Sequence, residues 1–185
     1  MFVNQDPTGG AYVVRSAHYT GYNINATAGS RTVITAALQK GDIVQLDPYN
    51  QDGYGLGLAV AKPTAGQVGQ LFVVIDVPNG VNDIVDSTTG RRRGGRINVA
   101  PSGVVQVRGN ATTNAITVGA LLSPYTGNAF HLEVSSGTTV AHMKARVSGT
   151  INETMPCGVA LEALASGSGL ILAQFGPCVG AGGIG

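Results

Sequence analysis

Few residues in this sequence have the types and spacings that catalysis or metal binding requires. The three histidines, His18, His131 and His142, lie in unrelated segments and lack the spacing of a metal site. The turn at 167–169 does not have the Gly-x-Ser-x-Gly spacing of a hydrolase nucleophile. No Gly-rich loop joins a strand to a helix, so the pattern contains no phosphate-binding loop. We therefore predict that the chain is not an enzyme and that it has no catalytic, cofactor-binding or metal site.

The acidic residues form one local cluster, consisting of Asp42, Asp47 and Asp52. A calcium-binding loop needs more oxygen ligands at closer spacing than these three carboxylates supply. Asp side chains also stabilise turns by accepting hydrogen bonds from nearby backbone N–H groups. We interpret the cluster as a set of turn-stabilising residues.

The basic residues are concentrated in one Gly-flanked segment that contains Arg91, Arg92, Arg93 and Arg96. One interpretation is a solvated loop between strands. Another is an anchor that pairs with carboxylates on a partner protein, because Arg holds carboxylates through two parallel hydrogen bonds. No aromatic residues flank these arginines and the formal net charge is only +1, so direct binding of nucleic acid is not expected.

The two cysteines, Cys157 and Cys178, flank two predicted strands. If the strands at 158–165 and 170–175 pair across a tight turn at 166–168, these cysteines become direct cross-strand neighbours. Facing cysteines can reach disulfide distance, but a cytoplasmic chain holds them reduced. A buried thiol pair and a disulfide that forms after release from the cell both remain open.

The composition is typical of a protein that is covered by polar uncharged residues or by neighbouring subunits. Charged residues make up 11% of the chain and Gly supplies 28 of 185 residues, whereas soluble domains average about 25% charged residues and about 7% Gly. No stretch approaches the roughly 20 apolar residues of a membrane span, so no membrane association is expected. The first twelve or so residues lack the pattern of a secretory signal, so we expect synthesis in the cytoplasm.

The hydrophobic pattern predicts an all-β chain with a sandwich or barrel core of the jelly-roll type. Helical periodicity is nearly absent, and the best helical candidate, 32–39, suits a strand equally well. Short apolar runs bounded by Gly, Pro and Asp predict roughly ten strands. They lie at 43–46, 56–61, 71–77, 96–100, 104–108, 115–118, 129–134, 141–147, 158–165 and 170–175. The run at 71–75 does not alternate, which predicts a strand buried on both faces.

A weak internal repeat is a further feature of the pattern. Residues 40–50 lead into 57–61 and a strand that ends at Asp76, and residues 118–125 lead into 158–163 and a strand that ends at Phe175. If the repeat is real, we expect the two halves to pack as paired sheets around one core. The segment 77–117 would then be a bridging insertion, with a tight hairpin at 101–103.

The two ends of the chain differ from its middle. Residues 1–30 are polar, with the isolated aromatic residues Tyr12, Tyr19 and Tyr22, and residues 177–185 are nearly all small. We therefore predict an extended N-terminal arm at 1–30, a β core domain at 31–176 and a flexible C-terminal tail at 177–185.

Three segments together resemble the capsid decoration, or cement, proteins of tailed bacteriophages. They are Gly41-Asp42-Ile43-Val44, Gly57-Leu58-Ala59-Val60-Ala61, and Gly158-Val159-Ala160-Leu161-Glu162-Ala163 before a Ser/Gly turn and a terminal strand. The resemblance covers most of residues 40–176. It implies a β-sandwich or barrel core, a homotrimer on the outer surface of the phage head, and arms that reach over neighbouring subunits of the major capsid protein.

On this resemblance the chain is a structural virion protein, made in the host cytoplasm and carried on the head surface. The arginine segment and the three N-terminal tyrosines are the candidate capsid contacts. Two alternatives stay open: a trimeric head or tail appendage that binds a receptor, and a β-sandwich hydrolase that uses His131 or His142.

Overall fold

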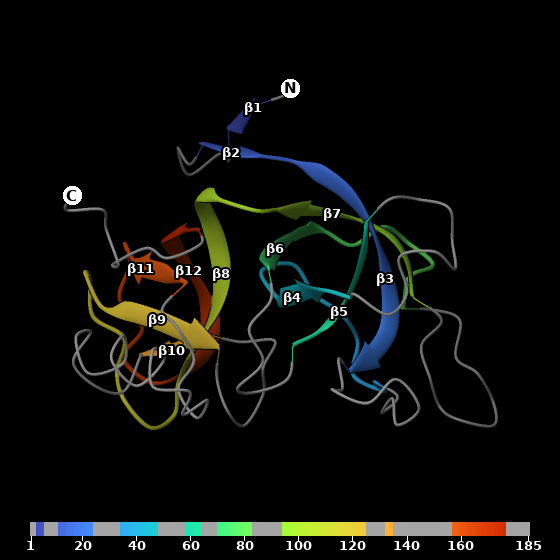
Figure 1. Ribbon diagram of the computed structural model, residues 1–185. Helices are drawn as coiled ribbons and strands as arrows, with labels where there is room; N and C mark the ends of the chain where they lie inside the picture. The colour runs from blue at the N-terminus through green and yellow to red at the C-terminus, as the bar shows by residue number, and fades with distance from the viewer. Residues whose placement is uncertain are drawn as a thin grey trace, which may run out of the picture.

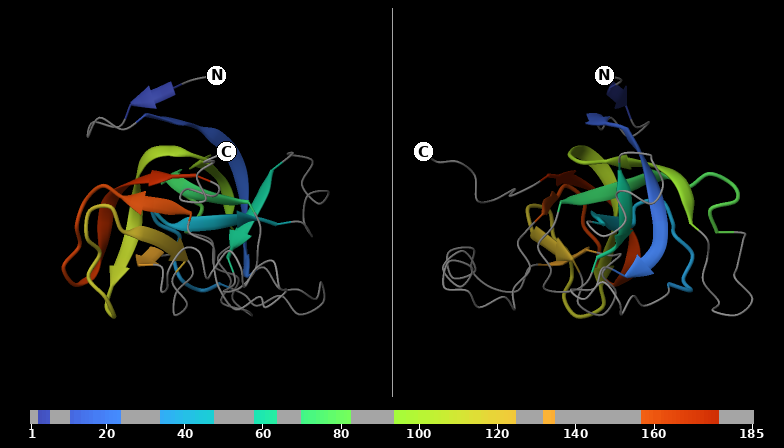
Figure 2. Two further views of the ribbon diagram at one scale, coloured as in Figure 1. Left: turned by 60° about the vertical axis from the view of Figure 1, so that its left-hand side comes forward. Right: turned by 45° about the vertical axis from the view of Figure 1, so that its right-hand side comes forward.

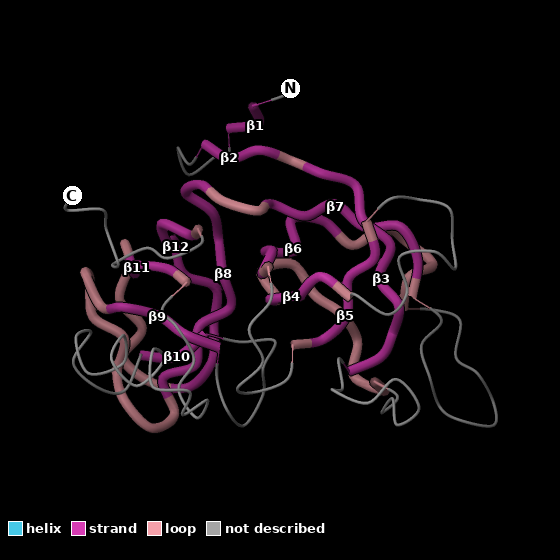
Figure 3. The backbone as a smooth tube through the Cα atoms, in the orientation of Figure 1, coloured by secondary structure: helices cyan, strands magenta, loops and turns pink. Residues whose placement is uncertain are grey.

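The computed structural model describes residues 3–5, 11–23, 34–47, 58–63, 70–82, 94–124, 132–134 and 157–176. These residues form strands, turns and irregular chain, and none of them is helical (Figure 3). The all-β prediction is confirmed. Residues 34–39, within the weak helical candidate, are irregular chain.

Five strands close into a first barrel. In ring order they are β3 (Arg15–Asn23), β5 (Ala59–Lys62), β4 (Ile43–Leu46), β6 (Leu71–Asp76) and β7 (Gly95–Ala100). β3 runs parallel to β5, and the other neighbours in the ring are antiparallel. This barrel is the right-hand half of the molecule in Figure 1.

Five further strands form a second ring beside the first. In ring order they are β8 (Gly103–Ala111), β10 (Leu132–Val134), β9 (Leu121–Pro124), β11 (Gly158–Ala160) and β12 (Gly167–Phe175). The long antiparallel pairing of β12 with β8 closes this ring. β8 is parallel to β10, and the remaining neighbours are antiparallel. Of the two architectures expected, sandwich and barrel, the chain has barrels.

The two barrels have the same topology. Numbered along the chain within each barrel, the strands follow the ring order first, third, second, fourth, fifth, with the first and third parallel. β3 to β7 thus correspond in order to β8 to β12. The predicted repeat is present, but its boundaries differ from those expected, because β11 corresponds to β6 and not to the segment at 57–61.

Equivalent hydrogen bonds place the repeat residue by residue. Gly41 N donates to Val74 O at 2.8 Å, and Gly119 N donates to Ala160 O at 2.8 Å. The two glycines begin equivalent strands and have left-handed φ values of 84° and 85°. The turn before β4 and the turn before β9 are therefore the same structural feature.

A second pair of equivalent bridges uses backbone groups in one barrel and a side-chain amide in the other. In the second barrel, Ile116 and Leu164 exchange two backbone hydrogen bonds of 2.9 Å. In the first barrel the Asn82 amide takes the place of Leu164: Leu38 N donates to Asn82 Oδ1 at 2.9 Å, and Asn82 Nδ2 donates to Leu38 O at 2.8 Å. Leu38 and Ile116 are both fully buried, so each of these bridges fixes a core side chain.

Each barrel has its own hydrophobic core, and β6 separates the two. Phe72 and Val74 point into the first barrel, whereas Val73 belongs to the core cluster of the second. All three side chains are fully buried. The prediction of a strand buried on both faces is confirmed, because one face lines a barrel and the other meets the neighbouring barrel.

The segment 77–117 is not a bridging insertion, and 101–103 is not a hairpin turn. β7 pairs with β3 and β6 in the first barrel, whereas β8 pairs with β2, β10 and β12. The chain passes from the last strand of one barrel into the first strand of the other (Figure 1). Alternating side chains reveal a strand with one buried face but do not identify the strand that pairs with it.

Residues 1–30 are not a single arm, because β3 is an integral strand of the first barrel. Ala17 and Tyr19 on β3 point into its core. Of the described strands, only β1 (Val3–Gln5) and β2 (Ala11–Val13) lie outside the two rings, where they extend the sheet beyond β8. Figures 1 and 2 show this pair at the top of the molecule, with β2 next to β8 and β1 on its outer side.

Two other strand predictions have different outcomes. Residues 115–118 form a single bridge at Ile116 and a turn, not a strand. The strand predicted at 141–147 and the tail at 177–185 lie outside the described residues.

Candidate interaction surface

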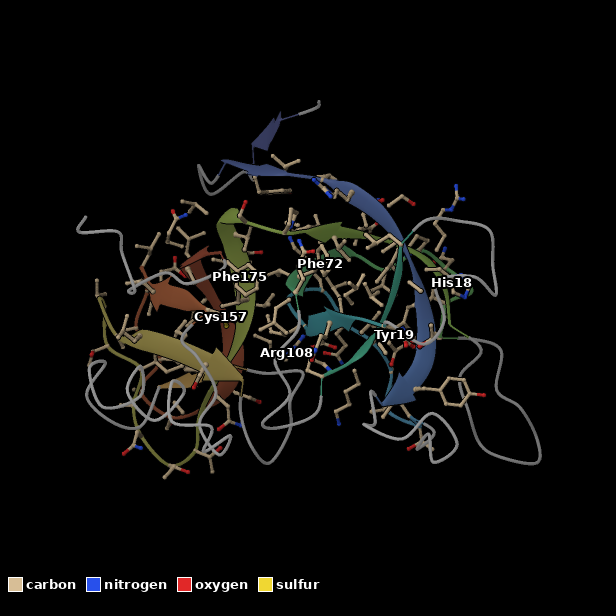
Figure 4. The ribbon with its side chains drawn as sticks, viewed as in Figure 1. His18, Tyr19, Phe72, Arg108, Cys157 and Phe175 are labelled. Atoms are coloured by element: carbon tan, nitrogen blue, oxygen red, sulfur yellow. The ribbon has the colours of Figure 1, made fainter. Side chains whose placement is uncertain are left out.

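The outer face of β3 and β7 presents the one described member of the arginine segment. Arg96 is exposed and lies directly opposite His18 in the antiparallel register of the two strands. Burial, and then the positive charge of Arg96, lower the pKa of His18. Figure 4 shows His18 at the side of the molecule remote from the second barrel. This face therefore carries a cation that the second barrel does not cover.

Two hollows meet at Arg96. One, of about 100 Å³, is lined by Ser16, Ala17, His18 and Arg96. The other, of about 500 Å³, lies between the turn at 78–81 and the start of β7, and Arg96 and Asn98 line it. The outer face of β3 and β7 is therefore indented on both sides of a positive charge, which suits contact with another protein.

Gly94 fixes where the arginine segment meets the first barrel. Its φ is +70°, and a Cβ atom at this position would collide with the backbone O of Tyr19. Only glycine satisfies both constraints without displacing β3. Arg91, Arg92 and Arg93, which the prediction placed with Arg96 in one contact surface, lie outside the described residues.

The structure does not group the three tyrosines of the predicted capsid contact. Tyr12 packs in the core cluster of the second barrel, and Tyr19 is 1% exposed in the core of the first. Burial, and then the charge of Asp42, raise the pKa of Tyr19. Tyr22 is partly exposed. Tyr12 and Tyr19 are core residues, because the strands that carry them alternate an inward with an outward side chain.

The cysteine prediction depends on a register that differs from the observed one. Gly158 faces Phe175, and Gly176 N donates to Cys157 O at 3.0 Å, so Cys157 aligns with Gly176. β11 ends at Ala160 and the chain leaves the ladder there, so no tight hairpin at 166–168 joins the two strands. Cys157 is a free, buried thiol, and burial raises its pKa to about 12. Cys178 lies outside the described residues.

An ion pair that the sequence did not reveal joins the two barrels. Arg108 Nε on β8 donates to Asp42 Oδ1 at 3.2 Å, and Arg108 N donates to Gly41 O at 2.8 Å. Arg108 Nη2 also lies 3.4 Å from the backbone O of Lys40. Figure 4 shows Arg108 between the barrels. The turn at 40–42 is thus held on β8 by side-chain and backbone contacts.

Asp42 has two structural roles at this joint. Its Oδ2 accepts a hydrogen bond from Gln39 N at 2.8 Å, which confirms the prediction that Asp42 stabilises a turn. Burial raises the pKa of Asp42 to about 6, although Gln39 and Arg108 act in the opposite direction. Arg108 was predicted only as part of an alternating strand. It is 66 residues from Asp42 in the chain, and no local pattern connects the two.

Within the described ranges, no group of three or more His, Cys, Asp or Glu side chains is placed to hold a metal ion. The same residues include no helix that is long and apolar enough to cross a membrane. No protein-family model matches this sequence, and no curated protein matches it significantly.

Proposed function

We propose that this chain is a structural protein of a phage particle, a decoration or cement protein that binds the major capsid protein on the outer surface of the head. It acts as a homo-oligomer, expected to be a trimer, and strengthens the shell by adding contacts across the seams between capsid subunits. Many modest contacts repeated around a shell give a large total stabilisation through multivalency.

The observation that carries the proposal is the β1–β2 pair. β1 pairs with β2, and β2 pairs with β8 of the second barrel at one register position, Tyr12 with Gly103. Among the described strands β1 is the last in the sheet order, so it offers one row of backbone N–H and C=O groups to a neighbouring molecule. Strand addition at such an edge gives affinity with little demand on side-chain identity. That property suits a clamp between subunits.

The low charge of the chain fits the same role. A surface poor in Lys, Arg, Asp and Glu gives weak electrostatic protection against association, which is acceptable in a protein that is covered by neighbours. The arginine segment then supplies a local charge for pairing with capsid carboxylates.

Truncation tests the clamp. Because β3 belongs to the first barrel, removing residues 1–30 would open that barrel, so the informative deletion ends at residue 10. We expect the chain lacking residues 1–10 to keep the unfolding midpoint of the full chain within a few degrees and to bind poorly to phage heads stripped of this protein. Binding is measured by co-sedimentation with the heads. Equal binding by the truncated and full chains would reject the proposal.

A further inference from the structure

The two barrels of one chain meet where a turn of the first barrel packs against two residues that face each other on neighbouring strands of the second. The turn at 40–42 of the first barrel contacts Arg108 on β8, and Arg108 faces Leu170 on β12 in the register of the second barrel. Gly41 is packed so closely there that an added Cβ atom would collide with Leu170 Cδ2.

An apolar wall lies beneath this turn. Ile43 on β4 and Val73 on β6 are fully buried, although both point away from the core of their own barrel. They belong to the hydrophobic cluster of the second barrel, and Ile75 packs against that cluster. The outward face of β4 and β6 is therefore apolar because the second barrel covers it.

Because of the repeat, the second barrel has an equivalent turn and an equivalent outward apolar face. No described part of the chain covers them. Leu121, Val159 and Leu161 occupy the positions of Ile43, Val73 and Ile75. Leu121 and Val159 are partly exposed and Leu161 is 40% exposed.

Val118, at the tip of the turn, is 65% exposed, and a Cβ atom at Gly119 would meet no described residue. We call the set formed by Val118, Leu121, Val159, Leu161 and the exposed Glu162 the turn surface.

The first barrel has the equivalent of the cross-strand pair. Arg96 opposite His18 on β7 and β3 corresponds to Leu170 opposite Arg108 on β12 and β8. This pair lies where the two hollows meet. The outward residues Ser16, His18, Arg96 and Asn98 form what we call the acceptor surface.

The two surfaces lie at opposite ends of the molecule. The segment that enters β9 forms the left-hand edge in Figure 1, whereas β3, which carries His18, forms the right-hand side (Figure 4). Such a placement suits head-to-tail contact between copies, since a copy that donates its turn surface at one end still offers its acceptor surface at the other.

We infer that the turn surface of one copy docks on the acceptor surface of a second copy, and so repeats between chains the contact that joins the two barrels within a chain. The apolar side chains of the turn surface become covered, and Glu162 supplies a carboxylate for Arg96. Repetition gives a closed ring or an open filament. The inference assigns Arg96 to contact between copies and leaves Arg91, Arg92 and Arg93 for the capsid. It rests on the self-association part of the proposed function and needs no capsid.

Two complementary substitutions test the inference in the purified full chain. Val118→Asp places a charge in the turn surface, and Arg96→Glu reverses the charge of the acceptor surface. Thr113→Asp, on an exposed turn outside both surfaces, is the matched control. Sedimentation velocity measures the mass of each variant alone and of the two variants mixed in equal amounts.

We expect the unaltered chain and Thr113→Asp to form the same oligomer, and each surface variant alone to be monomeric, with self-affinity lowered about tenfold or more. Mixing the variants should yield a one-to-one dimer, because one copy keeps an intact turn surface and the other an intact acceptor surface. A monomeric unaltered chain, surface variants that still form the full oligomer, or a mixture without dimer would each overturn the inference. Head binding by a monomeric variant would leave the capsid proposal standing while showing that it does not depend on this contact.

Discussion

Replacing Gly41 by Ala tests the joint between the barrels, and the repeat supplies a matched control in Gly119→Ala. Both glycines adopt nearly the same left-handed φ, so each substitution brings the same backbone strain, roughly 1–2 kcal/mol. The environments differ. A Cβ atom at Gly41 would collide with Leu170 Cδ2 and lie 3.1 Å from Arg108 N, whereas no described residue lies within 4 Å of one at Gly119.

The additional cost at Gly41 is that of overpacking, about 1–3 kcal/mol. Leu170 Cδ2 ends a flexible side chain and can move, but Arg108 N is backbone that donates to Gly41 O. We therefore expect Gly41→Ala to lower the free energy of unfolding by about 2–5 kcal/mol and Gly119→Ala by about 1–2 kcal/mol. Both substitutions are made in the Val118→Asp background, so that self-association does not contribute.

Urea denaturation followed by circular dichroism and by intrinsic tyrosine fluorescence gives the two free energies, provided that both probes report one transition. Equal losses for Gly41→Ala and Gly119→Ala would refute the reasoning, because they would mean that the turn at 40–42 is not packed against the second barrel.

Two further predictions concern side chains inside the fold. Because the pKa of Asp42 is raised from 3.8 to about 6, the folded chain retains a proton between about pH 4 and pH 6 that the unfolded chain has released. The free energy of unfolding should therefore rise by about 3 kcal/mol as the pH falls from about 6 to about 4. A pH series of unfolding free energies measures this rise. Asp42→Asn should abolish the rise, and Asp76→Asn, at an exposed position, should leave it unchanged. Asn82→Ala should lose about 1–3 kcal/mol in urea denaturation, because the backbone N–H and C=O of Leu38 lose their partners. Asn79→Ala, on the exposed side of the same turn, should change stability by less than about 0.5 kcal/mol.

The strand predicted at 43–46 has the observed bounds of β4, and the run at 71–77 differs from β6 by one residue. Both predictions worked because each strand is a dense apolar run that stops at a residue unsuited to a ladder. β3 was missed because its polar residues hide the alternation of Ala17 and Tyr19, which do point into the barrel. That two-residue period is the signal that could have identified it.

Local sequence patterns could not predict which strands pair or how the two barrels contact each other. The side-chain period of a strand tells which residues share a face but not which strand lies beside it, so β7 and β8 were assigned to one hairpin. The repeat was detectable because turns impose their own residues: both Gly41 and Gly119 need a left-handed φ. Its third and fourth strands were misaligned because Gly and Ala runs are common in this chain and do not fix a correspondence.

Differences between the equivalent residues separate the joint within the chain from the contact proposed between chains. The turn before β4 carries Asp42 against Arg108, whereas the turn before β9 has Ala120 at the same position, and His18 stands where the second barrel has Arg108. The barrels of one chain are joined by this ion pair, by the hydrogen bond from Arg108 N to Gly41 O, and by buried apolar side chains of β4 and β6. The turn surface has no equivalent ion pair. It presents apolar side chains with one carboxylate at their edge, which suits a contact that forms only when two chains meet. The same strand order thus supports a permanent joint in one place and a reversible one in the other, because a few side chains at the turn decide which.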